Sequence, residues 1–183
     1  MALFLGNKEP SEIYLGGKAI SEIYLGASLI YANLKEIYKD GVLMAGATLS
    51  NFEQSATDIF LNVGGGLQSG PFDRSQTGYV RFDMTKYNTI TVRGTDWCYG
   101  YSGSHYYARL GIDTGTGAGS VELPHKWRGT WGNEGEPATF EEVFDVSALI
   151  GQHTVAAYAR TDNVSNYYPG YTQIHITEII GGR

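Results

Sequence analysis

The fold class is decided by the stretches Tyr79-Val80-Arg81-Phe82-Asp83 and Thr89-Ile90-Thr91-Val92-Arg93. In both, apolar residues alternate with polar or amphipathic ones, which is typical of a strand with one buried face. Similar runs, separated by clusters of Gly, Ser, Asn and Asp, predict strands near residues 42–47, 59–63, 79–84, 89–94, 106–113, 139–145, 153–160 and 171–180. No segment keeps a 3.6-residue apolar period over a helical length. We therefore expect an all-β chain built around a β-sandwich or jelly roll.

The composition agrees with this expectation and narrows the function. The 183 residues include 25 Gly and 14 Tyr, which favour turns and half-buried strands. Tyr also favours contact surfaces, because it brings a large area and a hydrogen-bonding tip. The 13 Lys and Arg against 19 Asp and Glu give a net charge of −6. Without a basic stripe, a nucleic-acid partner is not expected.

A ten-residue repeat opens the chain. Phe4-Leu5-Gly6, Tyr14-Leu15-Gly16 and Tyr24-Leu25-Gly26 follow one another at this spacing. Each unit is predicted to be a short strand followed by a glycine turn, with apolar or aromatic side chains on both faces. Strands this short cannot bury two faces alone. Either the rest of the chain covers them or other molecules do.

An intermolecular contact is the favoured interpretation, and it divides the chain in two. Residues 1–40 are predicted to form an anchoring and oligomerisation module, and residues 41–183 a β-sandwich of jelly-roll type. The connector 32–39 fits either a strand or one helical turn. The predicted contact residues are Phe4, Leu5, Ile13, Tyr14, Leu15, Ile23, Tyr24 and Leu25.

The spacing of Ile13-Tyr14-Leu15-Gly16 and Ile23-Tyr24-Leu25-Gly26 resembles the N-terminus of virion structural proteins of tailed phages infecting Gram-positive bacteria. That family includes tail-fibre, baseplate, minor tail and head-decoration proteins. The resemblance covers residues 3–31 and implies an attachment element that is often trimeric. The first unit departs from the pattern, since Phe4 and Pro10 stand where Tyr and Ile are expected.

A second resemblance concerns the C-terminal strands. The turn in Phe144-Asp145-Val146-Ser147-Ala148-Leu149-Ile150-Gly151 is similar to one that precedes the last two strands of carbohydrate-binding jelly rolls. This likeness is to a fold pattern, and a fold does not by itself fix a function.

No catalytic pattern is found. Glu141 and Asp145 lack an identifiable carboxylate partner across a cleft, and the four histidines show no metal-ligand spacing. The glycine-rich stretches 64–66 and 115–119 are not followed by a helix pattern, so no phosphate cradle is expected. The single Cys98 is read as a packed residue rather than a reactive thiol. We predict a non-enzymatic protein without metal or cofactor.

Aromatic residues gather in segments rich in Gly and Ser, and they are the candidate binding residues. They are expected to stack on sugar rings or pack against a partner protein, while Trp97 and Tyr106 are expected in the core. The candidates are Tyr99, Tyr101, Tyr107, Trp127, Trp131, Tyr167 and Tyr168. The alternative is that some of these rings, Trp127 for example, close the ends of the sandwich.

Together these patterns predict a phage virion structural protein, an oligomer (a trimer is favoured) that contacts other virion proteins and host surface polysaccharide. It would be made in the host cytoplasm, because the N-terminus MALFLGNKEP lacks the features of a signal peptide, and no membrane insertion is expected. A non-viral carbohydrate-binding module is the alternative, and a polysaccharide depolymerase is a distant one.

Overall fold

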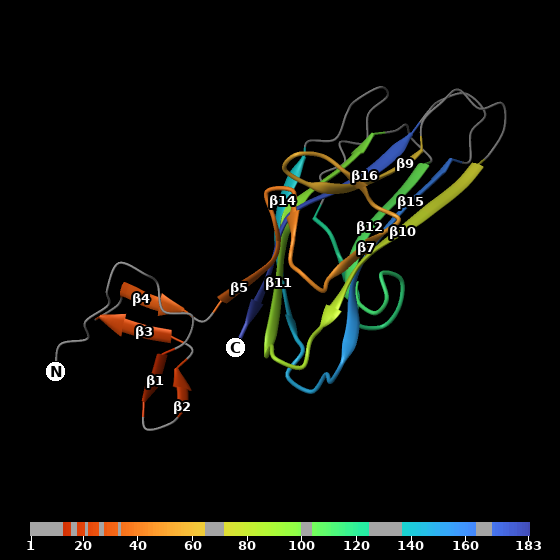
Figure 1. Ribbon diagram of the computed structural model, residues 1–183. Helices are drawn as coiled ribbons and strands as arrows, with labels where there is room; N and C mark the ends of the chain where they lie inside the picture. Colours follow the sequence, from red (N-terminus) through yellow and green to blue (C-terminus); the bar gives the residue numbers. More distant parts are fainter. Residues whose placement is uncertain are drawn as a thin grey trace.

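The computed structural model describes residues 13–15, 18–20, 22–25, 28–32, 34–64, 72–99, 104–124, 137–163 and 170–183. Within these ranges every regular element is a β-strand, so the expected all-β class is confirmed. The same ranges hold no helix long and apolar enough to cross a membrane. The strands from Leu34 onward form two antiparallel sheets that face each other as a sandwich (Figure 1).

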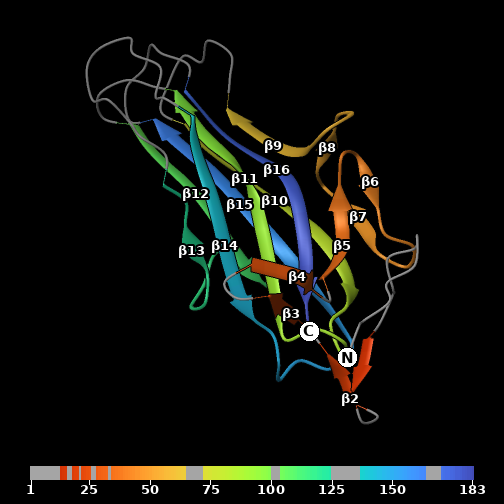
Figure 2. The same ribbon diagram turned by 90° about the vertical axis from the view of Figure 1, so that its left-hand side faces the viewer.

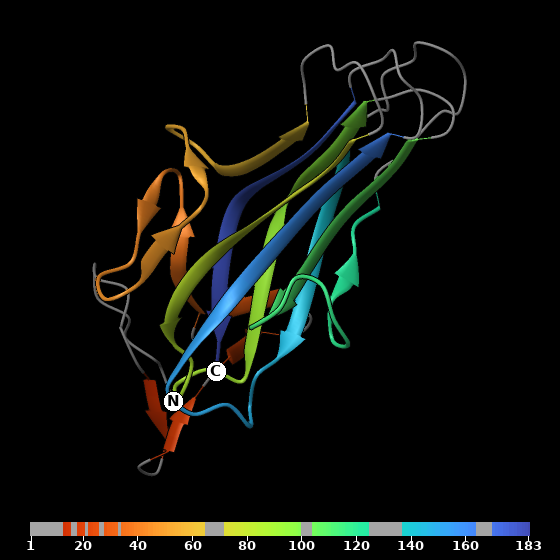
Figure 3. The same cartoon turned by 90° about the vertical axis from the view of Figure 1, so that its right-hand side faces the viewer.

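The first layer is a five-stranded sheet. Its order is β13 (Val121–Glu122), β12 (Ser104–Ile112), β15 (Gln152–Asn163), β10 (Phe72–Asp83) and β7 (Thr48–Ser50). The long strands β10, β15 and β12 cross the molecule side by side (Figure 3).

The second layer is a seven-stranded sheet whose central strand is β16 (Tyr171–Gly182). On one side of β16 lie β11 (Thr89–Tyr99) and the edge strand β14 (Ala138–Asp145). Its other side is shared by two strands. The first half of β16 pairs with β9 (Ile59–Gly64), which carries β8 (Glu53–Gln54), and the second half pairs with β5 (Leu34–Lys39), which carries β6 (Val42–Leu43).

The core between the sheets follows from the alternation in the sequence. Val80 and Phe82 on β10 are fully buried, and so are Ile90 and Val92 on β11. Their polar neighbours in the sequence face away from the core, at least in part exposed. Burying one such side chain stabilises the fold by about 1.5–3 kcal/mol. The same alternation therefore brings a defined set of residues to the outer face of each sheet.

Within the connector 32–39, Leu34–Lys39 form β5, which is a strand of the sandwich and not a helical turn. Ile37 and Tyr38 on β5 are buried in the core, and Tyr38 lies opposite Ile179 of β16. The tight turn at Asp40 and Gly41, both with positive φ, then returns the chain into β6. The sandwich thus includes β5, although the sequence predicts residues 34–39 as part of the N-terminal module.

The N-terminal repeat forms two hairpins. β1 (Ile13–Leu15) pairs with β2 (Lys18–Ile20), and β3 (Glu22–Leu25) pairs with β4 (Ser28–Ala32). Each is a two-stranded sheet of its own, outside the two sheets of the sandwich (Figure 2). The Ile-Tyr-Leu segment of each repeat is in the first strand of its hairpin. Phe4 and Leu5 lie outside the described residues.

The register brings many strand ends to one end of the sandwich, called the loop end below. Tyr99 pairs with Tyr171, which pairs with Gly64; in the other sheet Asn163 pairs with both Phe72 and Ser104. Strands on both sides of the stretches 65–71, 100–103 and 164–169 therefore end here. A hydrogen bond from Oγ1 of Thr172 to the carbonyl of Arg160 links the two sheets at this end.

Candidate ligand-binding site

The predicted binding residues fall into two groups. Tyr101, Trp127, Trp131, Tyr167 and Tyr168 lie outside the described residues. Tyr99 is the last residue of β11, at the loop end, and Tyr107 lies within β12. The structure thus describes the surroundings of Tyr107.

Tyr107 is half-buried on the outer face of the five-stranded sheet, between two arginines. The guanidinium carbons of Arg109 and Arg160 each lie 5.6 Å from its ring centroid. Arg160 is directly opposite Tyr107 on β15, and Arg109 is two residues further along β12. Both contacts have cation–π geometry. Tyr107 is therefore a strand residue in an ordered polar surface rather than a loop residue.

Two more tyrosines share this outer face. Tyr158 on β15 lies opposite Arg109, and Tyr79 on β10 lies opposite Ala156. Both are half-buried between fully buried neighbours, which turns their side chains outward. Diagonal neighbours on adjacent strands are about 7–8 Å apart. Tyr79, Tyr158 and Tyr107 therefore form a diagonal row across three strands, called the tyrosine face below.

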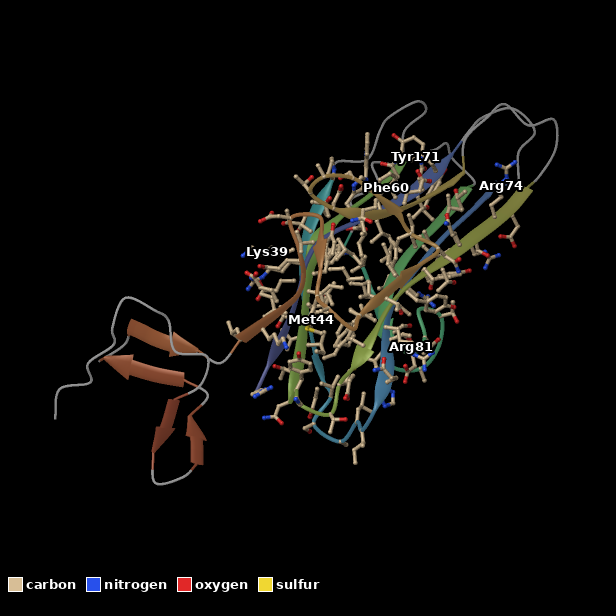
Figure 4. The ribbon with its side chains drawn as sticks, viewed as in Figure 1. Lys39, Met44, Phe60, Arg74, Arg81 and Tyr171 are labelled. Carbon is tan, nitrogen blue, oxygen red and sulfur yellow. The ribbon has the colours of Figure 1, made fainter. Side chains whose placement is uncertain are left out.

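Two arginines of this face lie next to carboxylates of neighbouring strands. The guanidinium of Arg160 donates two hydrogen bonds of 2.9 Å to the carboxylate of Asp73 on β10. Arg109 lies 3.9 Å from Glu122 on β13. Arg81 on β10 is exposed on the same face, and Figure 4 shows it along the side of the molecule that β10 forms. The tyrosine face thus offers aromatic rings beside fixed hydrogen-bond donors and acceptors.

The loop 113–120, which joins β12 to β13, packs on the tyrosine face. Gly115 sits so close to β15 that a Cβ there would lie 2.7 Å from Cβ of Tyr158. Asp113 anchors the loop by accepting hydrogen bonds from the amide of Thr154 and from Nδ1 of His153, each at 2.8 Å. The hydrogen bond with Asp113 raises the pKa of His153. Asp113 and Gly115 therefore hold this loop against β15, where the loop lies beside Tyr158.

Tyr79 and Tyr158 are not among the binding residues predicted from the sequence. A signal for Tyr79 was present, because it alternates with the buried Val80. Tyr158 stands between Ala157 and Ala159, which are fully buried but too small to mark a face. The expectation that Trp97 lies in the core is wrong, whereas Tyr106 is buried as expected. Trp97 is half-buried on the outer face of the seven-stranded sheet, where it contacts Tyr171.

No group of three or more metal-binding side chains occurs among the described residues. The core near the loop end is nevertheless polar. Asp96, Thr161 and Thr172 are fully buried there, and Cys98 is buried as well. A buried Cys is inert toward solvent, in agreement with its predicted packing role.

Comparisons with known proteins give little further guidance. No family model matches this chain, and no curated protein matches it. A solved structure, the N-terminal cellulose-binding domain of β-1,4-glucanase C from Cellulomonas fimi, has a TM-score of 0.32 and 15% identity. The match covers 75% of this chain and 89% of that domain. A similarity of this extent carries no argument about fold or ligand.

Proposed function

We propose that this chain is a non-enzymatic glycan-binding protein that recognises sugar through the tyrosine face. The observation that supports it best is the diagonal of Tyr79, Tyr158 and Tyr107 beside Arg109 and Arg160. Sugar rings present apolar C–H faces and hydroxyl edges. Aromatic rings pack on the first, and fixed charged groups hydrogen bond to the second.

The tyrosine face is also built to bind a ligand without a large movement of the protein. Its three strands are paired along their length, and bidentate contacts to Asp73 hold Arg160. A binding surface on rigid strands loses little conformational entropy when the ligand binds. This is the property expected of a module that binds an extended polysaccharide.

We further propose that the protein is an oligomeric virion component of a phage of Gram-positive bacteria. Two observations support this: the Ile-Tyr-Leu-Gly repeat, and the hairpins β1–β2 and β3–β4, which pair outside the sandwich sheets. In this proposal the hairpins attach the sandwich to the particle and to its copies. One weak sugar site per chain then gains strength by multivalency. A non-viral carbohydrate-binding module is the alternative.

The first experiment measures sedimentation of the purified protein with isolated cell walls of Gram-positive bacteria. Tyr158→Ala is expected to weaken binding by at least about tenfold, which is about 1.4 kcal/mol. Tyr158→Phe keeps the ring and should bind within about twofold of the parent. Val143→Ala, an exposed change on the other sheet, serves as the unaffected control. If the parent and Tyr158→Ala sediment equally while both stay folded, the tyrosine face is not the site.

The virion assignment has its own test. Labelled antibody against this chain, imaged on intact phage particles, is expected to mark a fixed position on each particle. Absence of label from particles, with the protein present in the infected cell, would leave the alternative of a non-viral module.

A further inference from the structure

We propose a second sugar-binding site on the opposite side of the sandwich, on the outer face of the seven-stranded sheet. It is built from Phe60 on β9, Trp97 on β11, and Tyr171, Gln173 and His175 on β16. The inference rests on the proposed function, because both faces would bind glycans of one host surface. The sandwich would then bind glycan on both of its outer faces.

The register places these residues in adjoining rows. His175 is paired with Phe60 on one side, and in the next row Gln173 is paired with Asn62 on one side and Trp97 on the other. Tyr171, Gln173 and His175 follow at every second position of β16. They therefore point to the same face and span about 13 Å. That length suits several consecutive sugar units rather than one.

Two aromatic pairs frame Gln173. The rings of Trp97 and Tyr171 meet edge to face, with centroids 5.4 Å apart. The rings of Phe60 and His175 are stacked at 5.2 Å and are 12° from parallel. All four side chains are half-buried, so each pair is held by its neighbours while part of it stays open to solvent. These two ring pairs, one on each side of the Gln173 amide, are suited to pack against successive rings of an oligosaccharide.

The side chain of His175 has a fixed role. Its Nδ1 lies 2.5 Å from the carboxylate of Asp58, which also accepts the hydroxyl of Ser55. With Nδ1 held by this carboxylate, Nε2 is the ring nitrogen that remains for a ligand. This ring nitrogen and the amide of Gln173, two residues earlier on β16, are polar groups of the kind that bind sugar hydroxyls.

The charge of this surface selects the ligand class. Two carboxylates lie beside it among the described residues, since Asp58 contacts His175 and Glu53 on β8 is paired with Phe60. The charged groups Glu141, Arg93, Glu178, Lys39 and Glu36 lie further along the same sheet, in mutual ion pairs. A patch of aromatic and amide groups bordered by the carboxylates of Asp58 and Glu53 favours a neutral glycan over a phosphate- or carboxylate-bearing one.

The test is a calorimetric titration of the full chain with two neutral probes, hexasaccharides of β-1,4-linked glucose and of β-1,4-linked N-acetylglucosamine. Two sites per chain are expected for the probe that binds. Gln173→Ala removes little packing and should leave one site, weakening the second at least tenfold. Trp97→Ala should do the same, and its melting temperature checks that it still folds. Val143→Ala on the same sheet is the matched control.

The outcomes separate the two proposals. A parent with one site that Tyr158→Ala removes and Gln173→Ala leaves unchanged overturns the second site and keeps the proposed function. A single site removed by Gln173→Ala and untouched by Tyr158→Ala supports the second site and overturns the tyrosine face. No binding of either probe, at protein concentrations that detect millimolar affinity, overturns both.

Discussion

Nδ1 of His153 lies 2.8 Å from Oδ2 of Asp113, and this contact makes part of the stability depend on pH. The hydrogen bond with Asp113 raises the pKa of His153. Burial tends to raise the pKa of Asp113, but hydrogen bonds from His153 and Thr154 bring it below its usual value. The stabilisation from His153 is therefore full below about pH 6.5 and is lost as the pH rises through the raised pKa.

The matching variant is His153→Gln. Urea unfolding of parent and variant between about pH 5 and pH 9 should show the largest stability difference at the acid end of that range, shrinking as the pH rises. The stabilisation from the Asp113 carboxylate depends on pH in the opposite way. It is lost only as the pH falls through the lowered pKa of Asp113. A difference that is constant with pH would contradict this account.

The row of charges on the seven-stranded sheet is expected to contribute modestly. Arg93 is 2.8 Å from Glu141 and 2.7 Å from Glu178, and Lys39 is 3.2 Å from Glu178. Arg93→Met should lower the free energy of unfolding by about 1 kcal/mol, because it leaves the half-buried Glu178 with one cation fewer. The loss should be smaller at high salt. Glu36→Gln, at the exposed end of the row, is the control and should be nearly neutral.

Gly94 is required where the register between β11 and β16 shifts. A Cβ at this position would lie 1.9 Å from the carbonyl oxygen of His175 and 2.8 Å from the ring of Phe140. Gly94→Ala should therefore destabilise the protein by about 3 kcal/mol, as overpacking against backbone does. Gly117→Ala, where the nearest neighbour is 3.6 Å away, should have little effect. The measurement is the melting temperature of each variant. Equal melting temperatures for the two variants would show that a Cβ at position 94 is tolerated.

Removal of residues 1–32 tests the role of the hairpins. We expect the full chain to be an oligomer by light scattering at micromolar concentration, and the shortened chain to be a monomer. The melting temperature of the sandwich should change little, since β1 to β4 pair outside its sheets. A full chain that is already a monomer would remove the oligomerisation role.

Metal removal is expected to have no effect. The sequence offers no cluster of ligands with metal-binding spacing, and oxygen ligands for Ca²⁺ must surround the ion. Chelation followed by dialysis should leave the melting temperature unchanged. A rise of several degrees on adding calcium would show that an ion contributes to the fold.

Strand positions could be predicted where one face is buried. The strands expected at 139–145 and 171–180 agree with β14 and β16 to within two residues at each end. The strand expected at 79–84 is longer, since β10 starts at Phe72. Its first half, Asp-Arg-Ser-Gln-Thr, is polar on both faces, so it carries no alternation.

The pairing of strands could not be predicted, and neither could the binding faces that depend on it. Tyr79, Tyr107 and Tyr158 are far apart in the sequence and become neighbours only through the order β10-β15-β12. On β11 the rule of apolar inside and polar outside is reversed, with Asp96 buried and Trp97 turned outward. The alternation that starts at Ile90 and Val92 continues unbroken along β11, so position in the strand and not side-chain polarity sets this reversal.

The position of β16 in the sequence has a consequence for synthesis on the ribosome. β5, β9 and β11 all pair with β16, which follows every one of them along the chain. Until β16 has emerged, these three strands have an open edge and apolar side chains without their central partner. Sheets that depend on such distant pairing form slowly and are prone to aggregation while incomplete. We therefore expect nascent chains stalled before Tyr171 to remain protease-sensitive, and protection to arise in one step once β16 is released.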